Sequence, residues 1–161
     1  RQRQMCIRDR VDTGSSFLPS EINSAFLWAQ LESLDQIQNR RKEMWGAYYE
    51  GLKDLADKGF FSLPDIPEYA TNNAHMFYLV CRSLDERTKL ISYLKDKDVN
   101  AVFHYLSLHL SDYYKDHHEG IIPNLPNCDR FADCLVRLPM FYELKDEEVQ
   151  IVVDAIKEYF L

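Results

Sequence analysis

A long helical pattern near the start of the chain limits the folds that are open to it. Apolar side chains recur at helical spacing over residues 22–29 and again over residues 34–55. Pro19 suits a first helical position, with Ser20 in the first turn. A pattern of this length is expected to break near Ser33 into a short and a long helix. The prediction is therefore two consecutive helices with apolar faces to bury.

Three apolar runs in the second half of the chain predict strands. Residues 75–81 form a continuous apolar run of the kind found in buried strands. Residues 99–105 and 134–141 give two further strand-like segments. The resulting order is helix–strand–helix–strand–loop–strand–helix. It predicts an α+β fold, with a small and mostly antiparallel sheet and helices packed on one face.

Local patterns predict how the remaining segments are organised. Residues 83–86 fit a capping box, S-x-x-E, that opens a helix, and Asp146 can cap a final amphipathic helix. Residues 107–130 carry Gly, Pro, Asn and paired His, and they are expected to form a loop with little regular structure. The aromatic stripe at residues 44–49 is expected to contribute to the core or to a dimer contact.

Charge and cysteine usage exclude several classes of partner. The formal net charge of −7 argues against nucleic acid, because phosphate binding needs a clustered positive field. No apolar run is long enough to span a bilayer, and no secretory signal is recognisable. The four cysteines have no zinc-type spacing and suit reduced thiols. We expect a cytoplasmic protein without a nucleic-acid or membrane partner.

The first ten residues, RQRQMCIRDR, differ from everything that follows them. They carry four arginines and show no apolar periodicity. A basic tail is one interpretation. The run MCIRDR, however, resembles a translated sequencing adapter, and we interpret residues 1–10 as a non-native extension. The native reading frame is then expected to continue upstream.

Four ordered segments carry a resemblance to a known family. They read VDTGSSFLPSEINSAFLWAQLE, NAHMFYL, AVFHYLSLHLS and LVRLPMFYELKDEEVQ, and together they run from Val11 to Leu161. The chain resembles the DegT-type sugar aminotransferases, which are pyridoxal-phosphate enzymes of fold-type I. The wording GSSFLPSE is similar to the subgroup that aminates a dTDP-linked keto-deoxyhexose for cell-surface polysaccharide.

The resemblance implies an architecture and a reaction. Residues 11–57 are expected to be an interdomain and dimer-forming helical segment, and residues 58–161 a small C-terminal domain of a homodimer. The intact enzyme would use pyridoxal 5'-phosphate to transfer an amino group, from a donor expected to be glutamate, to the keto carbon of a dTDP-4-keto-6-deoxyhexose. The family's Schiff-base lysine is expected before Val11. No catalytic residue is therefore assigned in this chain, which is expected to be inactive alone.

Two serines are the cofactor candidates that the resemblance supplies. Ser15 and Ser16 precede the first helix, where the wider family commonly has Gly-x-Asn and the Asn reaches the partner subunit's cofactor phosphate. Serine hydroxyls can donate to phosphate, and amides near a helix start favour anions. The alternative is a simple turn and cap made for backbone reasons.

The substrate candidates lie in HYLSLH, residues 104–109. Similar proteins read H-Y-x-P-x-H here and line the sugar-nucleotide pocket with this segment. His109 is the main candidate for a substrate contact, with His104 and Tyr105 beside it, although His104 alternatively serves a structural role. Ser107 replaces the usual Pro and leaves the path of the segment open. No metal site is expected, because two histidines five residues apart lack a third ligand at a defined spacing.

Several other residues are expected to have structural roles. His75, Phe77 and Tyr78 resemble a family strand and are expected to pack in the core. Arg137 is expected to pair with a carboxylate of the same domain. The paired histidines at residues 117–118 are expected to be solvated.

Two further functions stay open at this stage. A sugar dehydratase relative has the same fold, with a histidine in place of the cofactor-binding lysine. A stand-alone, non-catalytic α+β binding module would require the arginine-rich start to be native. The ordered motifs favour the aminotransferase.

Overall fold

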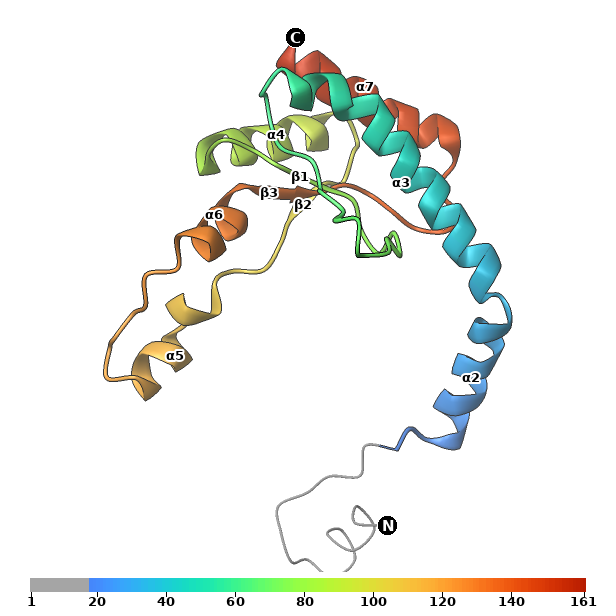
Figure 1. The fold of residues 1–161 in the computed structure, drawn as a ribbon, viewed down its shortest axis with the longest axis horizontal. Coiled ribbons are helices and arrows are strands. Elements are labelled where there is room, and N and C mark those ends of the chain that lie inside the picture. The colour runs from blue at the N-terminus through green and yellow to red at the C-terminus, as the bar shows by residue number, and fades with distance from the viewer. Residues whose placement is uncertain (1–17) are drawn as a thin grey trace, which may run out of the picture. The chain divides into compact units, whose positions relative to one another are not determined.

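The computed structural model describes residues 18–161 (Figure 1). The chain divides between Gln36 and Ile37 into two units, and each is described by itself. Within residues 18–161, no helix combines the length and apolar character needed to cross a bilayer. The elements, in order, are α2 (Glu21–Glu32), α3 (Leu34–Asp57), β1 (Tyr78–Val80), α4 (Leu84–Asp96), β2 (Val102–Phe103), the 3₁₀ helix η1 (Leu108–Leu110), α5 (Asp112–His117), α6 (Pro126–Cys134), β3 (Leu135–Arg137) and α7 (Asp146–Phe160).

Helix α2 begins later than the sequence pattern predicted. Ser20 is its N-cap, with extended backbone, and its hydroxyl accepts a hydrogen bond from the amide of Asn23 at 3.3 Å. Pro19 therefore lies before the helix, because the serine hydroxyl satisfies an amide that has no partner within the helix. The predicted break is confirmed, since Ser33 ends α2 and α3 starts at the next residue. No residue of α2 is buried.

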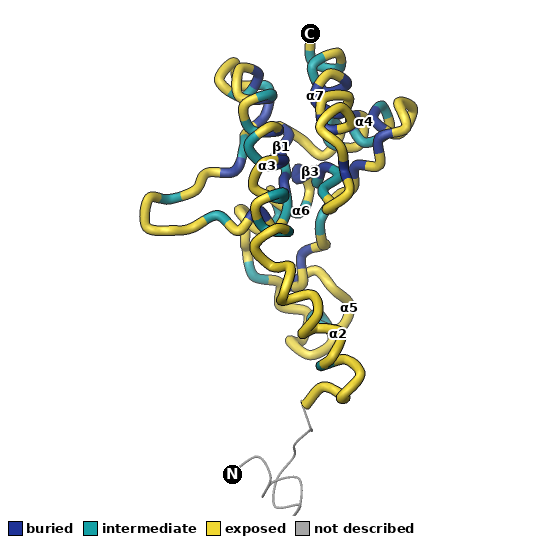
Figure 2. The backbone as a smooth tube through the Cα atoms, turned by 90° about the vertical axis from the view of Figure 1, so that its right-hand side faces the viewer, coloured by how far each residue is buried: buried dark blue, intermediate teal, exposed yellow. Residues whose placement is uncertain are grey.

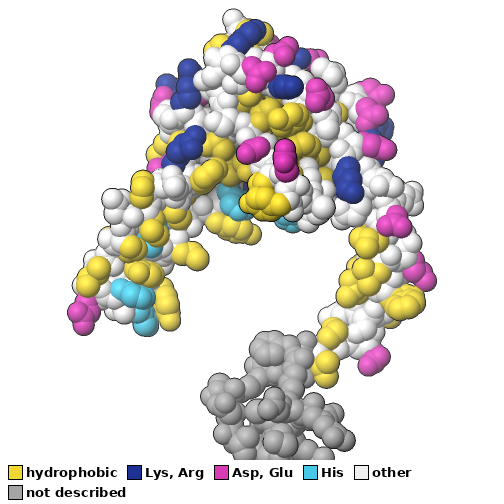
Figure 3. All heavy atoms as spheres, in the orientation of Figure 1, with side chains coloured by type: hydrophobic (Ala, Val, Ile, Leu, Met, Phe, Trp, Pro, Cys, Tyr) yellow, Lys and Arg dark blue, Asp and Glu magenta, His cyan; other side chains and the backbone are white. Residues whose placement is uncertain are grey.

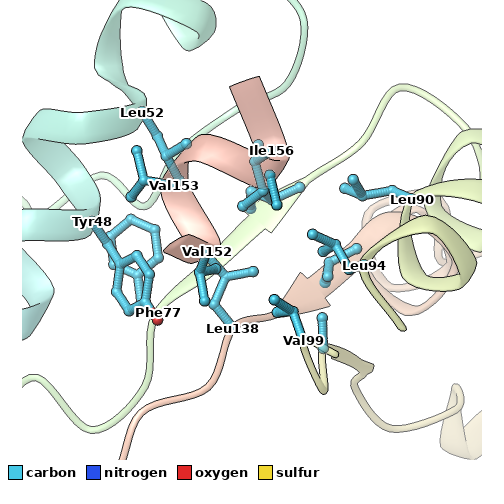
Figure 4. Packing of buried hydrophobic residues seen from close by; sticks show 14 of the residues in the cluster. Tyr48, Leu52, Phe77, Leu90, Leu94, Val99, Leu138, Val152, Val153 and Ile156 are labelled. Atoms are coloured by element: carbon cyan, nitrogen blue, oxygen red, sulfur yellow. The ribbon is translucent and has the colours of Figure 1, made fainter. Parts of the chain in front are cut away.

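The core lies where α3, α4 and α7 pack above the sheet (Figure 4). One stripe of α3 faces it and comprises Met44, Tyr48, Leu52 and Leu55. The ring of Tyr48 stacks on that of Phe77 with centroids 5.2 Å apart, and its hydroxyl donates to the Pro139 carbonyl at 2.8 Å. The aromatic stripe at residues 44–49 thus has the core role that its spacing predicted.

Helices α3 and α7 approach each other closely. A Cβ added at Gly51 would lie 2.9 Å from a methyl of Val153, so glycine permits this contact. Near the start of α7, the Arg40 guanidinium pairs with the Asp146 carboxylate at 2.7 Å and also donates to the Leu144 carbonyl. The helix pair is therefore held by an apolar contact between Gly51 and Val153 and by the polar contacts of Arg40 near the start of α7.

Two helix starts differ in detail from the predicted caps. Ser83 caps α4 as expected, accepting from the Glu86 amide at 3.2 Å, while the Glu86 carboxylate pairs with a neighbouring arginine. The prediction that Asp146 caps α7 is wrong by one residue. Lys145 is the N-cap, and the Glu148 carboxylate accepts a hydrogen bond from its amide at 2.8 Å. Asp146 instead occupies the first turn, where a negative charge suits the helix dipole.

The sheet is antiparallel and has the order β1-β3-β2, so β3 is central (Figure 1). Tyr78 pairs with Arg137 on one side of β3, and Val102 pairs with Arg137 on the other. All three predicted strands form, but each is only two or three residues long. The length of each strand depends on how many residues its neighbour offers for pairing. A single apolar run does not indicate that number. The predicted α+β class is confirmed.

The prediction of a loop at residues 107–130 is wrong. The segment contains η1, α5 and the start of α6. The Ser111 hydroxyl caps α5 by accepting from the Tyr114 amide at 3.2 Å, and Pro126 begins α6 at a position where its missing N–H costs nothing. Residues 117–118 are exposed as predicted, although they lie at the end of a helix.

Candidate functional site

The candidate site lies on residues 104–134, named the β2–β3 segment because it joins those two strands. Since β2 and β3 are neighbours in the sheet, both ends of the segment start from the same place. Figure 2 shows that the tube around α5 is mostly exposed, in contrast to β1, β3 and α7. Figure 3 shows apolar and histidine side chains gathered on the surface that carries α5. The segment is therefore anchored to the sheet at both ends, and it carries exposed apolar and histidine side chains.

His104 and Tyr105 form the first of two groups on this segment. They follow β2 directly, and their ring centroids lie 4.6 Å apart. The Tyr105 side chain is 76% exposed, whereas His104 is half-buried. The Nδ1 atom of His104 is buried and has no hydrogen-bond partner within residues 18–161. This pair thus offers an open aromatic face and a buried imidazole nitrogen that has no partner in the described part of the chain.

His109 belongs to the second group and points away from solvent. Its side chain is only 5% exposed, and its Nε2 lies 3.2 Å from Oδ1 of Asp129 in the first turn of α6. The two groups can form an ion pair when the ring is protonated. They are not aligned for a hydrogen bond, so Nε2 lacks a hydrogen-bond partner in the described part of the chain. The structure thereby joins η1 to α6 through side chains that are far apart in sequence.

Ser107 links the members of the second group. It is itself buried, and its hydroxyl donates to Oδ1 of Asp129 at 3.0 Å. The Cys128 thiol donates in turn to the Ser107 hydroxyl at 3.5 Å. Ser107 therefore does more than replace a proline, because a proline could make neither contact. Beside this group, an apolar hollow of about 290 Å³ is lined chiefly by Leu106, Leu108 and Leu110.

The structure therefore places the sequence-predicted site residues in two separate groups. His104 and Tyr105 lie together, while His109 faces Asp129, which sequence reasoning did not single out. Cys128 was noted only as a reduced thiol. Neither Cys128 nor Asp129 could be assigned to this group, because only the return of the chain through α6 places them beside η1. Ser15 and Ser16 lie outside the described residues.

Two structural expectations near the sheet are wrong. His75 is exposed and does not pack in the core, whereas Phe77 is fully buried as predicted. Among residues 18–161, no carboxylate lies within ion-pair distance of Arg137. Arg137 instead lines a small hollow of about 180 Å³ together with His75 and Asn100. Arg137 pairs on both sides within the sheet through its backbone, and its side chain is half-buried.

Known proteins resemble this chain both in sequence and in fold. A sequence model of the DegT/DnrJ/EryC1/StrS aminotransferase family matches residues 2–157. The fold is similar to that of the aminotransferase TlmJ from Streptoalloteichus hindustanus, with a TM-score of 0.78 and 23% identity over 92% of this chain and 38% of that one. It is also similar to S. venezuelae DesV, solved with a ketimine intermediate, with a TM-score of 0.80 and 24% identity over 98% of this chain and 43% of that one.

A third similar structure is PseC of Helicobacter pylori, an aminotransferase involved in the biosynthesis of pseudoaminic acid. Its TM-score is 0.77, with 19% identity over 92% of this chain and 39% of that one. At these identities the likeness establishes a common fold. The chain spans about two fifths of the length of the solved proteins that it matches.

Proposed function

This chain belongs to the DegT/DnrJ/EryC1/StrS aminotransferase family, and we propose that it is the C-terminal part of a sugar-nucleotide aminotransferase. The family match over residues 2–157 is the observation that carries the proposal. The enzyme would move an amino group from glutamate to the keto carbon of a dTDP-4-keto-6-deoxyhexose. The wording GSSFLPSE in the sequence supports the dTDP-4-amino-4,6-dideoxygalactose transaminase subgroup.

The family's cofactor is pyridoxal phosphate, which when bound supplies the electron sink for amino transfer. In this chain we propose Ser15 and Ser16 as contacts to its phosphate, since hydroxyl groups are suitable donors. We assign the Schiff-base lysine to sequence before Val11 in the intact enzyme. The 161-residue chain is accordingly proposed to be inactive alone and to bind the cofactor weakly.

We propose that the β2–β3 segment contacts the sugar nucleotide. The exposed ring of Tyr105 suits stacking on a flat or apolar ligand face. The unpartnered Nδ1 of His104 can bond a ligand hydroxyl or phosphate once the ring turns to expose this buried atom. His109 belongs to the same proposal through its place in the segment. In the apo chain its ring faces Asp129, so a direct contact would require the segment to rearrange.

We propose residues 11–57 as the interdomain and dimer-forming part and residues 58–161 as the small domain of a cytoplasmic homodimer. The absence of any buried residue in α2, which carries exposed Phe26 and Trp28, supports a role for that helix against another domain or subunit. Such apolar side chains are commonly covered in an assembly.

The test is to read the source gene upstream of the codon for Val11 and to express the continuous frame. Incubation with pyridoxal phosphate, glutamate and dTDP-4-keto-6-deoxyglucose should give the amino sugar nucleotide, detected by mass spectrometry. A lysine at the cofactor position and amine transfer would support the proposal. A histidine there, with loss of a hydroxyl instead, would assign a dehydratase. A frame that begins with RQRQMCIRDR would leave a non-catalytic binding module.

The site proposal has a test of its own in the same enzyme. Tyr105→Ala should raise KM for the sugar nucleotide by about tenfold, the equivalent of roughly 1–2 kcal/mol of lost stacking. His117→Gln removes an exposed histidine of the same segment and should leave both kcat and KM unchanged. Equal KM values in the two variants would remove Tyr105 from the substrate pocket.

A further inference from the structure

We propose that His109, Cys128 and Asp129 form a binding site for a zinc-class divalent cation, in the arrangement of the β2–β3 segment that turns His109 toward Asp129 and away from the proposed substrate contact. Each residue offers one ligand atom: an imidazole nitrogen, a sulfur and a carboxylate oxygen. These three atoms all lie within 4.8 Å of one another. Zinc holds such ligands at about 2.0–2.3 Å, so three atoms this close can share one ion after small side-chain rotations.

The state of His109 is the observation that favours an ion over a plain surface cluster. Its Nε2 is buried and has no hydrogen-bond partner within residues 18–161, although Asp129 Oδ1 is only 3.2 Å away. A buried nitrogen without a partner is costly and calls for an explanation. A cation beside Nε2 and Oδ1 would accept the nitrogen lone pair and would neutralise the carboxylate. By contrast, the exposed His117 already bonds a backbone carbonyl through its Nδ1.

The surroundings of the three ligands support the same assignment. The buried Ser107 hydroxyl donates to the Asp129 carboxylate, which is how outer partners orient the ligands of a metal. The Cys128 thiol donates to the same hydroxyl and would release that proton on binding the ion. Cys128 is exposed and Asp129 is partly exposed, so an ion can reach the site from solvent. The mixed nitrogen, sulfur and oxygen donors favour zinc over magnesium or calcium, which prefer oxygen ligands.

A bound ion would connect η1 to the first turn of α6. The chain between His109 and Cys128, which carries α5, would become a closed loop whose free ends are fixed by the metal. Zinc binding should therefore raise the stability of the β2–β3 segment, with release of the Cys128 thiol proton.

The test uses cobalt as a spectroscopic substitute for zinc, in the metal-free 161-residue chain with Cys6→Ser as background. We expect one Co²⁺ per chain, a near-ultraviolet thiolate-to-cobalt charge-transfer band, and visible bands of a tetrahedral ion that zinc displaces. In Cys128→Ser the charge-transfer band should vanish. Zinc affinity should fall by more than the roughly 10–100-fold that loss of an outer partner costs. His109→Gln should weaken binding similarly, whereas His117→Gln should bind as the parent does.

Two results would overturn the site. One is a parent chain that shows neither a charge-transfer band nor a zinc-dependent rise in its unfolding midpoint. The other is a band that persists unchanged in Cys128→Ser, which would place the thiolate elsewhere. Should that variant fail to fold, Ser107→Ala must still weaken zinc binding by about 10–100-fold. The readout needs no amino transfer, so its failure would leave the proposed function standing.

Discussion

The packed core and the β2–β3 segment are held together by different means. In the core, Tyr48, Leu52 and Leu90 are fully buried by other parts of this chain. In the segment, buried side chains are few, and large apolar groups such as Leu108 and Ile121 are mostly exposed. The core is thus specified by its own contacts, whereas the segment shows the apolar surface that partner surfaces commonly cover. Substitutions in the core should therefore lower the free energy of unfolding more than substitutions in the segment.

The largest difference should come from removing one aromatic ring in each region. Tyr48→Ala deletes a buried ring and leaves the Pro139 carbonyl without its donor, and it should lower the free energy of unfolding by about 3–5 kcal/mol. Tyr113→Ala removes an exposed ring of α5 and should change stability by less than about 0.5 kcal/mol. Urea unfolding followed by circular dichroism measures both. Similar losses for the two variants would abolish the distinction between the regions.

Alkaline pH should act on the core first. Burial raises the pKa of the Cys81 thiol from its ordinary value of 9.0 to about 12, and burial also raises the pKa of Tyr48. Between these pH values the unfolded chain has lost the thiol proton that the folded chain retains. Stability is therefore full below about pH 9 and falls as the pH rises toward 12.

Thiol labelling checks this expectation site by site. In a Cys6→Ser background with chelator present, a thiol reagent should label the exposed Cys128 quickly at pH 8. Cys81 should be labelled only as the core unfolds, slowly at pH 8 and faster as the pH rises from about 9 toward 12. Rapid labelling of Cys81 below pH 9 would show that the core opens far more readily than its packing implies.

Two glycines on α3 sharpen the comparison within a single helix. Gly51→Ala would drive a methyl into Val153, whose branched side chain cannot easily rotate, and should cost about 1–2 kcal/mol despite better helix propensity. Gly46 has open space around its Cβ direction, so Gly46→Ala should stabilise the chain by about 0.5–1 kcal/mol. Thermal unfolding of the two variants should shift in opposite directions. A stabilising Gly51→Ala would contradict the close α3–α7 approach, whereas a destabilising Gly46→Ala would contradict the open space at that position.

The smallest effect is expected from charge pairs at the rim of the core. Arg40→Met removes the pair with Asp146 and the bond to the Leu144 carbonyl, and should cost about 1 kcal/mol. Lys89→Met removes an exposed pair with Asp85 and should lower stability by less than Arg40→Met does. Half-molar salt should reduce the loss of stability caused by Lys89→Met more than the loss caused by Arg40→Met.

Sequence reasoning succeeded where periodicity alone determines burial. The stripe through Met44, Tyr48 and Leu52 and the apolar face of α7 were predictable because one helical face must meet the core. Strand lengths were not predictable, since β1 and β2 extend only as far as β3 offers partners. Helix α5 was missed because a turn-rich composition concealed the Ser111 cap.

The candidate site was predictable only in part. The pattern HYLSLH places His104 and Tyr105 side by side because they are neighbours in sequence, and their role as substrate contacts stays a prediction. The facing of His109 toward Asp129 depends on the return of α6 to the sheet, and no spacing rule encodes that. The proposed cofactor contacts of Ser15 and Ser16 lie outside the described residues and stay predictions.

The central position of β3 determines when the sheet can assemble during synthesis. Within residues 18–161, β3 is the last strand in the chain and the one strand that pairs with both β1 and β2. Until Leu135 emerges, β1 has only its bridge from Val80 to Ser62 and β2 has no strand partner, and closing either pair with β3 requires a long loop. Synthesis proceeds at about 5–20 residues per second, so this interval lasts for seconds. During it the helical half of the nascent chain and its unpaired strands must not associate wrongly. A ribosome stalled shortly before Leu135 would hold a chain with every helix of the first half but no sheet.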